Sequence, residues 1–445
     1  MADDENDVPA RAGSLLRRQI LTVALLFLGY CAYYFCRVNL SVGMPLLVDD
    51  LGRHGVAHDE AVTRLGTVSA AGVLAYALGK MFLGGLGDYW GGRRSFLIGL
   101  GGAVAFTALF AAGGGLPVFT IAWIGNRLTQ SIGWAGILKV CSKWFDFSSH
   151  GAIVGILSVS YLAGDAGARY WMGAMISAGH DWRSIFHLAA LVAAVLFVAN
   201  YFLLRESRTD LGHRRATANP LNLYAGRHDA KLTIAALVLP LLRSRAFLLV
   251  CVLSFGCTVV RDTFGTWTPI YLHEAVGLEV GRAGSLSGVF PLLGGVSVLV
   301  VGWLSDRMGS NGRPLLLLGG LTATAGTLAC LTLLNVAVVP PLAIVALIGV
   351  VAFFLLGPYS YLGGAFALDF GGHRAGAVSS GIIDGVGYLG GALAGDTVGR
   401  ISVAYGWRGV FLALAIVTAA SVIAAAALFV QQSAVVVPAA GEDDG

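Results

Sequence analysis

Two arginines lie inside apolar stretches of the sequence, where a charged side chain is costly. Arg37 is in CAYYFCRVNLSVGMP and Arg261 is in CTVVRDTFGTWTP, and a proline follows each arginine eight residues later. A charge at membrane depth costs about 2.5 kcal/mol or more, so such a residue marks a functional site by default. A guanidinium stays charged and offers a planar fork of N–H donors, which suits phosphate oxygens. The pair is therefore our first candidate for a binding site.

Other charged residues fall within the apolar stretches. Lys80, in YALGKMFLGGLGD, either faces an internal cavity or extends its amine towards the membrane surface. Asp165 and Arg169 are spaced to pair on one helix face, which leaves both a neutralised ion pair and a substrate contact open. Asp384 could take up a proton, pair with an arginine or contact a hydroxyl group.

The composition indicates a membrane protein. Of 445 residues, 56% are hydrophobic and 12% are charged, whereas charged residues make up about 25% of an ordinary soluble protein. The apolar windows are long and lack the alternation of barrel strands, so they predict an all-α bundle. We expect twelve spans, near residues 20–47, 63–86, 95–113, 117–141, 150–176, 183–204, 246–273, 282–305, 314–334, 340–366, 376–402 and 407–430.

Basic residues concentrate at segments that share one side if the spans alternate, among them Arg93, Arg94 and the stretch from Arg205 to Arg245. The positive-inside rule makes that side cytoplasmic and places both termini there. We therefore attribute the net charge of +4 to the membrane topology of the chain rather than to a nucleic-acid partner. The first span is too long for a cleaved signal peptide, and we interpret the six cysteines as packing residues.

The sequence divides into two halves that repeat each other. The polar stretch 205–245 separates the spans six and six, which predicts bundles at 1–204 and 246–445 joined by a cytoplasmic linker. DWRSIFHLAALVA, starting at Asp181, resembles GWRGVFLALAIVT, starting at Gly406. The loops GGLGDYWGGRR and GWLSDRMGSNGR form a second matching pair, in nearly the same register as Arg37 and Arg261.

Parallel six-span repeats are the architecture of the major facilitator superfamily, whose substrate site lies between the halves. The loop with Asp88 and Arg93 resembles that superfamily's signature loop, and Asp306 with Arg307 forms its second copy. We expect the acidic residue to lie near a helix end and the arginines to bind helix carboxyl termini, which would latch one conformation.

Within that superfamily the segment YYFCRVNLSVGMPLL closely resembles the first helix of the organophosphate:phosphate antiporters, and Arg261 with Trp267 and Pro269 resembles their seventh helix. The resemblance implies that Arg37 and Arg261 bind the phosphate of the substrate. It also places Lys80 in the same cavity, and QSIGWAGILKVCSKWF resembles the fourth helix through Trp134.

Further candidates for substrate contacts are aromatic or acidic. Tyr30 and Tyr34 lie on or near the helix face of Arg37, and their hydroxyl groups could bind the substrate. Tyr161 takes the place of a histidine in the bacterial glycerol-phosphate transporter. Asp384 precedes a GYLGG run that contains Tyr388 and resembles a run of the family. The chain departs from the family at Ala135 and Gly136, where several members have prolines, and at Pro291, where several carry an acid.

We therefore predict a secondary transporter that exchanges a sugar phosphate or glycerol phosphate for inorganic phosphate by alternating access. Two alternatives remain, an organic-anion/proton symporter and a sugar-phosphate sensor that does not transport. The sequence lacks a phosphate-binding loop, a metal-ligand cluster and a convergent nucleophile with its base, so we expect no cofactor and no enzyme activity. We expect a monomer in the cell (inner) membrane.

Overall fold

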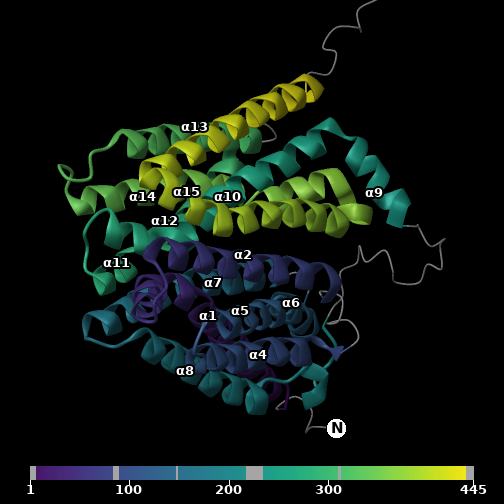
Figure 1. Cartoon of the computed structure of the whole chain (residues 1–445). Helices are drawn as coiled ribbons and strands as arrows, with labels where there is room; N and C mark the ends of the chain where they lie inside the picture. Colours follow the sequence, from purple (N-terminus) through teal and green to yellow (C-terminus); the bar gives the residue numbers. More distant parts are fainter. Residues whose placement is uncertain (1–6, 84–89, 147–148, 217–233, 309–311, 437–445) are drawn as a thin grey trace, which may run out of the picture. The chain divides into compact units, whose positions relative to one another are not determined.

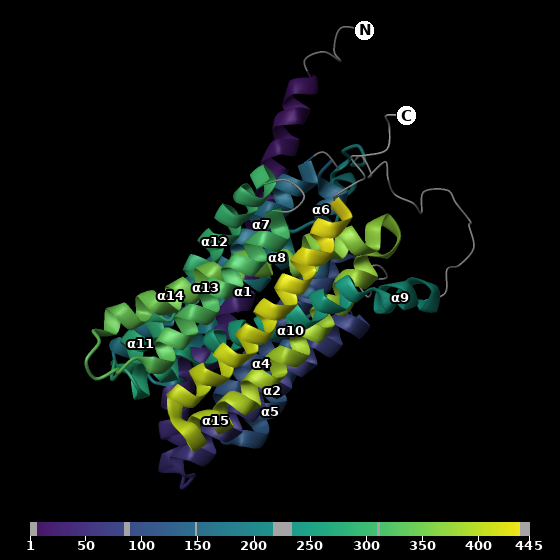
Figure 2. The ribbon, with the colours of Figure 1, turned by 90° about the horizontal axis from the view of Figure 1, so that it is seen from above.

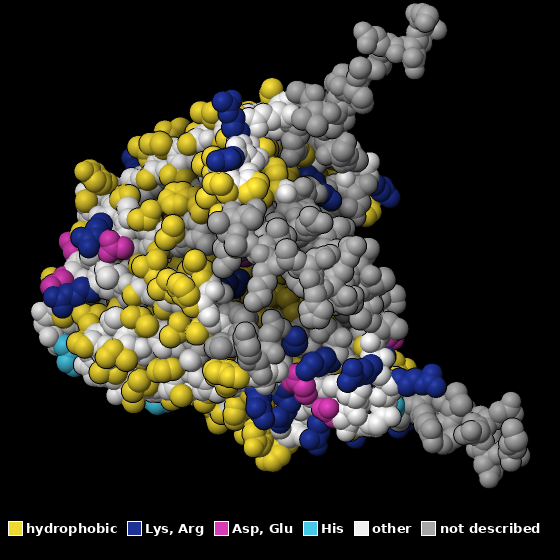
Figure 3. All heavy atoms as spheres, turned by 90° about the vertical axis from the view of Figure 1, so that its right-hand side faces the viewer, with side chains coloured by type: hydrophobic (Ala, Val, Ile, Leu, Met, Phe, Trp, Pro, Cys, Tyr) yellow, Lys and Arg dark blue, Asp and Glu magenta, His cyan; other side chains and the backbone are white. Residues whose placement is uncertain are grey.

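The computed structural model describes residues 7–83, 90–146, 149–216, 234–308 and 312–436, and the regular elements in these ranges are helical (Figure 1). Large hydrophobic side chains face outward on the helices, such as Leu333 at 83% exposure and Phe82 at 73%. Hydrophobic side chains cover much of the described surface in Figure 3, and Lys and Arg gather in a few places. An apolar exterior of this kind suits a lipid environment.

The first half of the chain forms helices that match the expected spans closely. They are α1 (Asp7–Arg53), α2 (His58–Leu83), α4 (Gly92–Ala112), α5 (Leu116–Gln130), α6 (Gly133–Trp144), α7 (His150–Ser177), α8 (Trp182–Leu203) and the short η2 (Arg208–Leu211).

The second half begins with a short helix that lies within the linker region. Its helices are α9 (Ile234–Arg243), α10 (Arg245–Glu274), α11 (Val280–Leu286), α12 (Val289–Met308), α13 (Gly312–Leu333), α14 (Pro341–Tyr359), η3 (Leu362–Phe366) and α15 (Ala367–Val436).

Nine stretches among the described residues are helices long and apolar enough to cross a membrane. The pair α5 and α6 and the helix α7 add two crossings, and α15 supplies two because it reverses direction, which gives the expected twelve. The prediction of an all-α membrane bundle is confirmed.

The reversal within α15 occurs near Gly406, whose φ of 66° lies in the left-handed region that glycine tolerates. Trp267 of α10 donates to the carbonyl of Ala394, and Phe264 of α10 stacks on Phe411. In a straight helix Ala394 and Phe411 would lie about 25 Å apart. Both arms of α15 therefore run along α10, as the two antiparallel ribbons in Figure 2 show.

Two of the expected spans are each interrupted by a short turn. The span at 117–141 breaks between Gln130 and Gly133, where Ser131 donates its backbone N–H to the carbonyl of Leu128 in a turn. The span at 282–305 breaks between Leu286 and Val289, and Pro291 occupies the first turn of α12. Proline lacks an N–H donor and is well tolerated in the first turn of a helix, where that donor would have no partner within the helix.

Contacts divide the chain into two compact units. One contains Met1–Gly43 and Ala75–His228, and the other contains Met44–Leu74 and Asp229–Gly445. The second unit therefore includes the second part of α1 and the first part of α2. The predicted bundle boundaries at 204 and 246 stay a prediction.

Glycine allows close helix contacts in the first unit. A methyl group at Gly136 of α6 would lie 2.7 Å from the carbonyl oxygen of Gly92 in α4, and one at Gly92 would lie 2.6 Å from the carbonyl oxygen of Gly136. Small residues let helix backbones approach in membranes. Gly136 is thus a packing residue between α4 and α6.

We predict that Gly136→Ala destabilises the protein by about 1 to 3 kcal/mol, since an added methyl group would overpack the contact between α4 and α6. The melting temperature of the detergent-solubilised protein would report this loss. Gly155→Ala is the matched control, because a methyl group there meets nothing within 4 Å. Equal melting temperatures for the two variants would contradict the close-packing argument.

Candidate substrate-binding site

Arg37 is held in place by hydrogen bonds and by aromatic rings in the first unit. Its Nε donates to Oε1 of Gln130 at 3.1 Å, and its NH1 donates to the hydroxyl of Tyr34 at 3.2 Å. The guanidinium carbon lies 4.8 Å from the ring centroid of Tyr34 and 4.5 Å from that of Tyr76. Cation–π contacts of this kind stabilise a desolvated charge. The guanidinium is thereby fixed by α1, α2 and α5 together.

A chain of buried polar groups supports Gln130 from behind. The amide of Gln130 donates to Oδ1 of Asn126 at 2.7 Å, and the amide of Asn126 donates to Oγ1 of Thr107 at 2.9 Å. Gln130, Asn126 and Thr107 are each about 1% exposed. A satisfied buried network holds its members in one geometry. Gln130 therefore positions Arg37, although it is itself neutral.

The aromatic residues expected around Arg37 do gather there. The ring of Tyr34 lies 6.0 Å from that of Tyr161 and 5.7 Å from that of Tyr30, and the ring of Tyr30 lies 5.3 Å from that of Trp134. Tyr33 differs, because it is fully buried and donates its hydroxyl to the carbonyl of Phe96 at 2.6 Å. Its ring also lies 5.4 Å from that of Tyr30, so Tyr33 adjoins this aromatic group, but its hydroxyl is bound to the backbone of α4.

Two further cations share the ring of Tyr76 with Arg37. The guanidinium carbon of Arg127 lies 5.1 Å from its centroid, and Nζ of Lys80 lies 5.5 Å away. The sequence analysis placed Lys80 near Arg37 but missed both Tyr76 and Arg127. Their signals were available, since Tyr76 precedes Lys80 by four residues and Arg127 lies within an expected span.

Asp165 and Arg169 of α7 form an ion pair with 2.5 Å between Oδ1 and Nε. Arg169 is 3% exposed and also donates to the hydroxyl of Ser41 at 3.4 Å. Removing one partner of a buried pair would leave an uncompensated charge. The geometry is that of the neutralised pair, one of the two interpretations left open by the sequence.

Arg261 is held in the second unit in a closely similar way. Its Nε donates to Oδ1 of Asp262 at 2.9 Å, its NH1 donates to the hydroxyl of Tyr359 at 2.8 Å, and its guanidinium carbon lies 5.0 Å from the ring centroid of Tyr359. The same hydroxyl accepts from Thr258 at 3.3 Å. Sequence reasoning missed Tyr359 because it is 98 residues from Arg261.

The remaining candidates of the second unit lie on α15. A methyl group at Gly363 of η3 would lie 2.5 Å from Oδ1 of Asp384, so the glycine lets this carboxylate approach the backbone of η3. Tyr388 lies one helical turn after Asp384 and is half-buried. Asp396 forms an ion pair with Arg400 at 2.8 Å and accepts from Thr67 at 2.7 Å.

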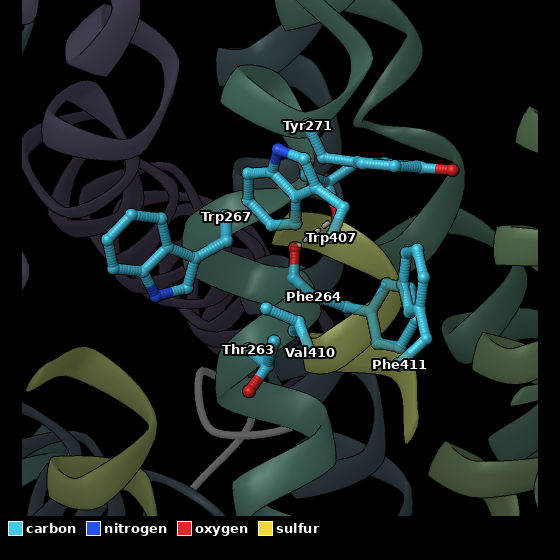
Figure 4. Close-up of a pocket in the computed structure, with 8 residues that line it drawn as sticks. Thr263, Phe264, Trp267, Tyr271, Trp407, Val410 and Phe411 are labelled. Carbon is cyan, nitrogen blue, oxygen red and sulfur yellow. Dashed lines mark hydrogen bonds between the residues drawn. The ribbon is translucent and has the colours of Figure 1, made fainter. Parts of the chain in front are cut away.

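A small, open pocket lies among aromatic side chains of α10 and α15 in the second unit. Figure 4 shows Phe264 and Phe411 turned to one side of it and Trp267 to the other. Its lining carries no charged side chain and consists of Thr263, Phe264, Trp267, Thr268, Tyr271, Trp407, Val410 and Phe411. It therefore offers no counter-ion for a phosphate.

Arg93 begins α4 and binds the carboxyl end of α8. Its Nε donates to the carbonyl of Leu204 at 2.6 Å, and its NH2 donates to the carbonyl of Tyr201. Cations at a helix carboxyl terminus interact favourably with the exposed carbonyl groups. Asp88, in the same loop, lies outside the described residues. In the second loop, the side chain of Asp306 also lies outside them. The guanidinium carbon of Arg307 lies 3.9 Å from the ring centroid of Trp303.

Glu206, which the sequence analysis did not single out, completes this contact. Its carboxylate accepts from the backbone N–H groups of Gly92 at 2.9 Å and Arg93 at 2.7 Å, and from Lys143 at 2.6 Å. A carboxylate at a helix amino terminus is stabilised by the unpaired N–H groups there. Burial alone would raise the pKa of Glu206, but these contacts hold it below its usual value.

We predict that Glu206→Gln lowers the melting temperature at pH 7, because each hydrogen bond to a charged group contributes about 1.5 to 3 kcal/mol. A lowered carboxyl pKa gives stability that is complete above the unfolded pKa of about 4.3 and is lost as pH falls through the folded pKa. The difference between wild type and variant should therefore shrink below about pH 4. A melting series in detergent from neutral to acidic pH would measure it.

Glu60→Gln is the control for this series, because Glu60 pairs with Arg64 on an exposed helix face. Exposed pairs contribute about 0 to 1 kcal/mol, so its melting temperature should stay near that of the wild type. A Glu206→Gln deficit that is the same at acidic and neutral pH would contradict the role of the carboxylate.

Known proteins resemble this chain over most of its length. The family model described as Major Facilitator Superfamily matches residues 26–395. A probable hexose phosphate transport protein of Chlamydia trachomatis is 25% identical, over 87% of this chain and 86% of the relative. The membrane sensor protein UhpC of Escherichia coli K12 is 23% identical, over 93% of this chain and 92% of the relative.

Among solved structures, a bacterial homolog of the human lysosomal transporter Spinster, inward-facing and unoccupied, resembles the chain with a TM-score of 0.73. The match covers 94% of this chain and 97% of that one at 13% identity, so it shows a common fold. The fold of this chain is thus one that a solved transporter-like structure shares.

Proposed function

Because this chain belongs to the major facilitator superfamily, we propose that it exchanges a phosphorylated organic solute, a sugar phosphate or glycerol phosphate, for inorganic phosphate. The relative from Chlamydia trachomatis is named for hexose phosphate transport, which supports a phosphate ester as the substrate. In this proposal Arg37 and Arg261 bind the phosphate group, and the rest of the solute contacts the aromatic residues beside Arg37.

The observation that carries the proposal is the matching environment of the two arginines. Each donates through Nε to a side-chain oxygen and through NH1 to a tyrosine hydroxyl, and each stacks on the ring of that tyrosine. A guanidinium that is already oriented loses little freedom when it binds a phosphate. Two such groups offer charge and donor geometry for a dianion.

Exchange follows from the cost of an empty site. Several cations at membrane depth repel one another, and a bound anion relieves that repulsion. A site that changes its access only when an anion occupies it would carry phosphate in one direction and the organic phosphate in the other. The charge distribution of the sequence supports cytoplasmic termini, and we place the protein in the cell (inner) membrane as a monomer.

A sensor is the second candidate, because the match to the membrane sensor protein UhpC covers nearly the whole chain. Such a protein would bind the sugar phosphate with the same arginines and would not carry it across. An organic-anion/proton symporter would instead depend on a titrating carboxylate, for which Asp384 is the candidate, and would give Arg261 no direct role.

Phosphate self-exchange in proteoliposomes tests the proposal. We expect labelled phosphate to enter vesicles loaded with phosphate and not empty vesicles, without any proton gradient. Arg37→Lys and Arg261→Lys should each lower the rate by about tenfold or more, since lysine keeps the charge but loses the fork of donors. Arg64→Lys, at an exposed pair with Glu60, is the control that should retain exchange.

The outcomes separate the candidates. Uptake that requires a proton gradient and ignores internal phosphate would establish the symporter. Binding of a sugar phosphate without counterflow of labelled phosphate would establish the sensor. Normal exchange in both lysine variants would rule out the two arginines as the phosphate site.

A further inference from the structure

Asp262 lies beside the cation that is proposed to bind phosphate in the second unit. Its Oδ1 accepts from Nε of Arg261 at 2.9 Å, and the hydroxyl of Tyr359 accepts from NH1 of Arg261 at 2.8 Å. Because Nε donates to Asp262, a phosphate that binds in a bidentate manner would use the edge formed by NH1 and NH2. The carboxylate and the phosphate would therefore share one guanidinium.

The carboxylate of Asp262 is held by α15 as well as by Arg261. A methyl group at Gly391 of α15 would collide with Oδ2 of Asp262, so the glycine leaves the room that this carboxylate occupies. Consecutive residues of a helix do not face each other, so proximity in the sequence does not by itself produce the pair. The packing of α10 against α15 thus determines where the carboxylate lies.

The arginine of the first unit has a neutral acceptor at the same atom. Nε of Arg37 donates to the amide oxygen of Gln130 at 3.1 Å, and NH1 donates to the hydroxyl of Tyr34 at 3.2 Å. A neutral oxygen is therefore sufficient to orient a guanidinium in this chain. The negative charge of Asp262 exceeds what orientation requires, and it acts on any anion that binds to Arg261.

Two negative charges on one guanidinium repel each other. The side chain of Asp262 is only 18% exposed, so water and salt screen its charge poorly. Repulsion from the carboxylate weakens the binding of a phosphate, and weaker binding usually means faster dissociation. An exchanger has to release each anion before it binds the next one, so faster dissociation favours turnover.

We propose that Asp262 orients Arg261 and, through its charge, weakens the binding of phosphate, so that the bound anion is released readily during exchange. This inference rests on the proposed function, in which Arg261 binds the phosphate. Asp262 is then a positioning residue that also sets the affinity of the site. Gln130 orients Arg37 without this effect on affinity.

Asp262→Asn removes the charge and keeps an oxygen that can accept from Nε of Arg261. Thermal stabilisation of the purified protein by inorganic phosphate would give the dissociation constant, and self-exchange in proteoliposomes would give the maximal rate. We expect phosphate to bind about tenfold more tightly to the variant, because the repulsion is removed, and the maximal rate to fall about threefold or more. A structural defect would instead weaken binding and slow exchange together.

Gln130→Glu is the mirrored variant, because it places a carboxylate at Nε of Arg37. We expect phosphate to bind about tenfold more weakly to this variant. Glu60→Gln is the control for the loss of a carboxylate, since Glu60 pairs with Arg64 on an exposed helix face in the same unit as Asp262. Its dissociation constant and its maximal rate should equal those of the wild type.

The outcomes distinguish this inference from the proposed function. Unchanged or weaker phosphate binding by Asp262→Asn would overturn the inference even where the wild type exchanges phosphate normally, and so would tighter binding with an undiminished exchange rate. Tighter binding by Asp262→Asn in a protein that does not exchange phosphate would support the effect of the carboxylate and reject transport. Absence of phosphate binding in both proteins would overturn both proposals. If Asp262→Asn does not fold, Gln130→Glu decides, and an unchanged affinity in that variant would overturn the inference.

Discussion

A guanidinium at membrane depth needs neighbouring groups that offset the free-energy cost of removing it from water. This constraint organises the first unit. Arg37 meets it with a neutral oxygen from Gln130, a hydroxyl from Tyr34 and two aromatic rings. The oxygen is fixed in turn by Asn126 and Thr107. The arginine thus depends on helices α1, α2, α4 and α5 being packed in one arrangement, and glycine contacts such as that of Gly92 with Gly136 make close packing possible.

In the second unit Arg261 is stabilised by similar contacts, but the group that accepts from its Nε is charged. The Nε group of Arg261 donates to the carboxylate of Asp262, where that of Arg37 donates to a neutral amide. The ion pair with Asp262 partly offsets the charge of Arg261. Arg37, by contrast, shares its aromatic partner Tyr76 with two more cations. The two arginines therefore have matching hydrogen bonds but differ in the charges next to them.

Interruptions in the helices matter as much as their lengths. The break after Gln130 ends α5 directly behind the residue that holds Arg37, and α6 restarts with Trp134 beside Tyr30. Gly406 turns the last helix back along α10, so that both arms of α15 contact the helix carrying Arg261. The turn after Gln130 is buried, and backbone turns at membrane depth are tolerated where protein surrounds them.

The sequence alone determined the membrane class and the spans and made Arg37 a candidate binding residue, because hydropathy and the cost of a buried charge are local properties. It also placed Tyr30 and Tyr34 on or near the helix face of Arg37. Only the tertiary structure selected Gln130 and Tyr359 as the partners of the arginines, since those contacts join residues 93 and 98 positions apart. It likewise gathered Lys80 and Arg127 around Tyr76, because helix packing, which no local pattern encodes, decides which faces meet.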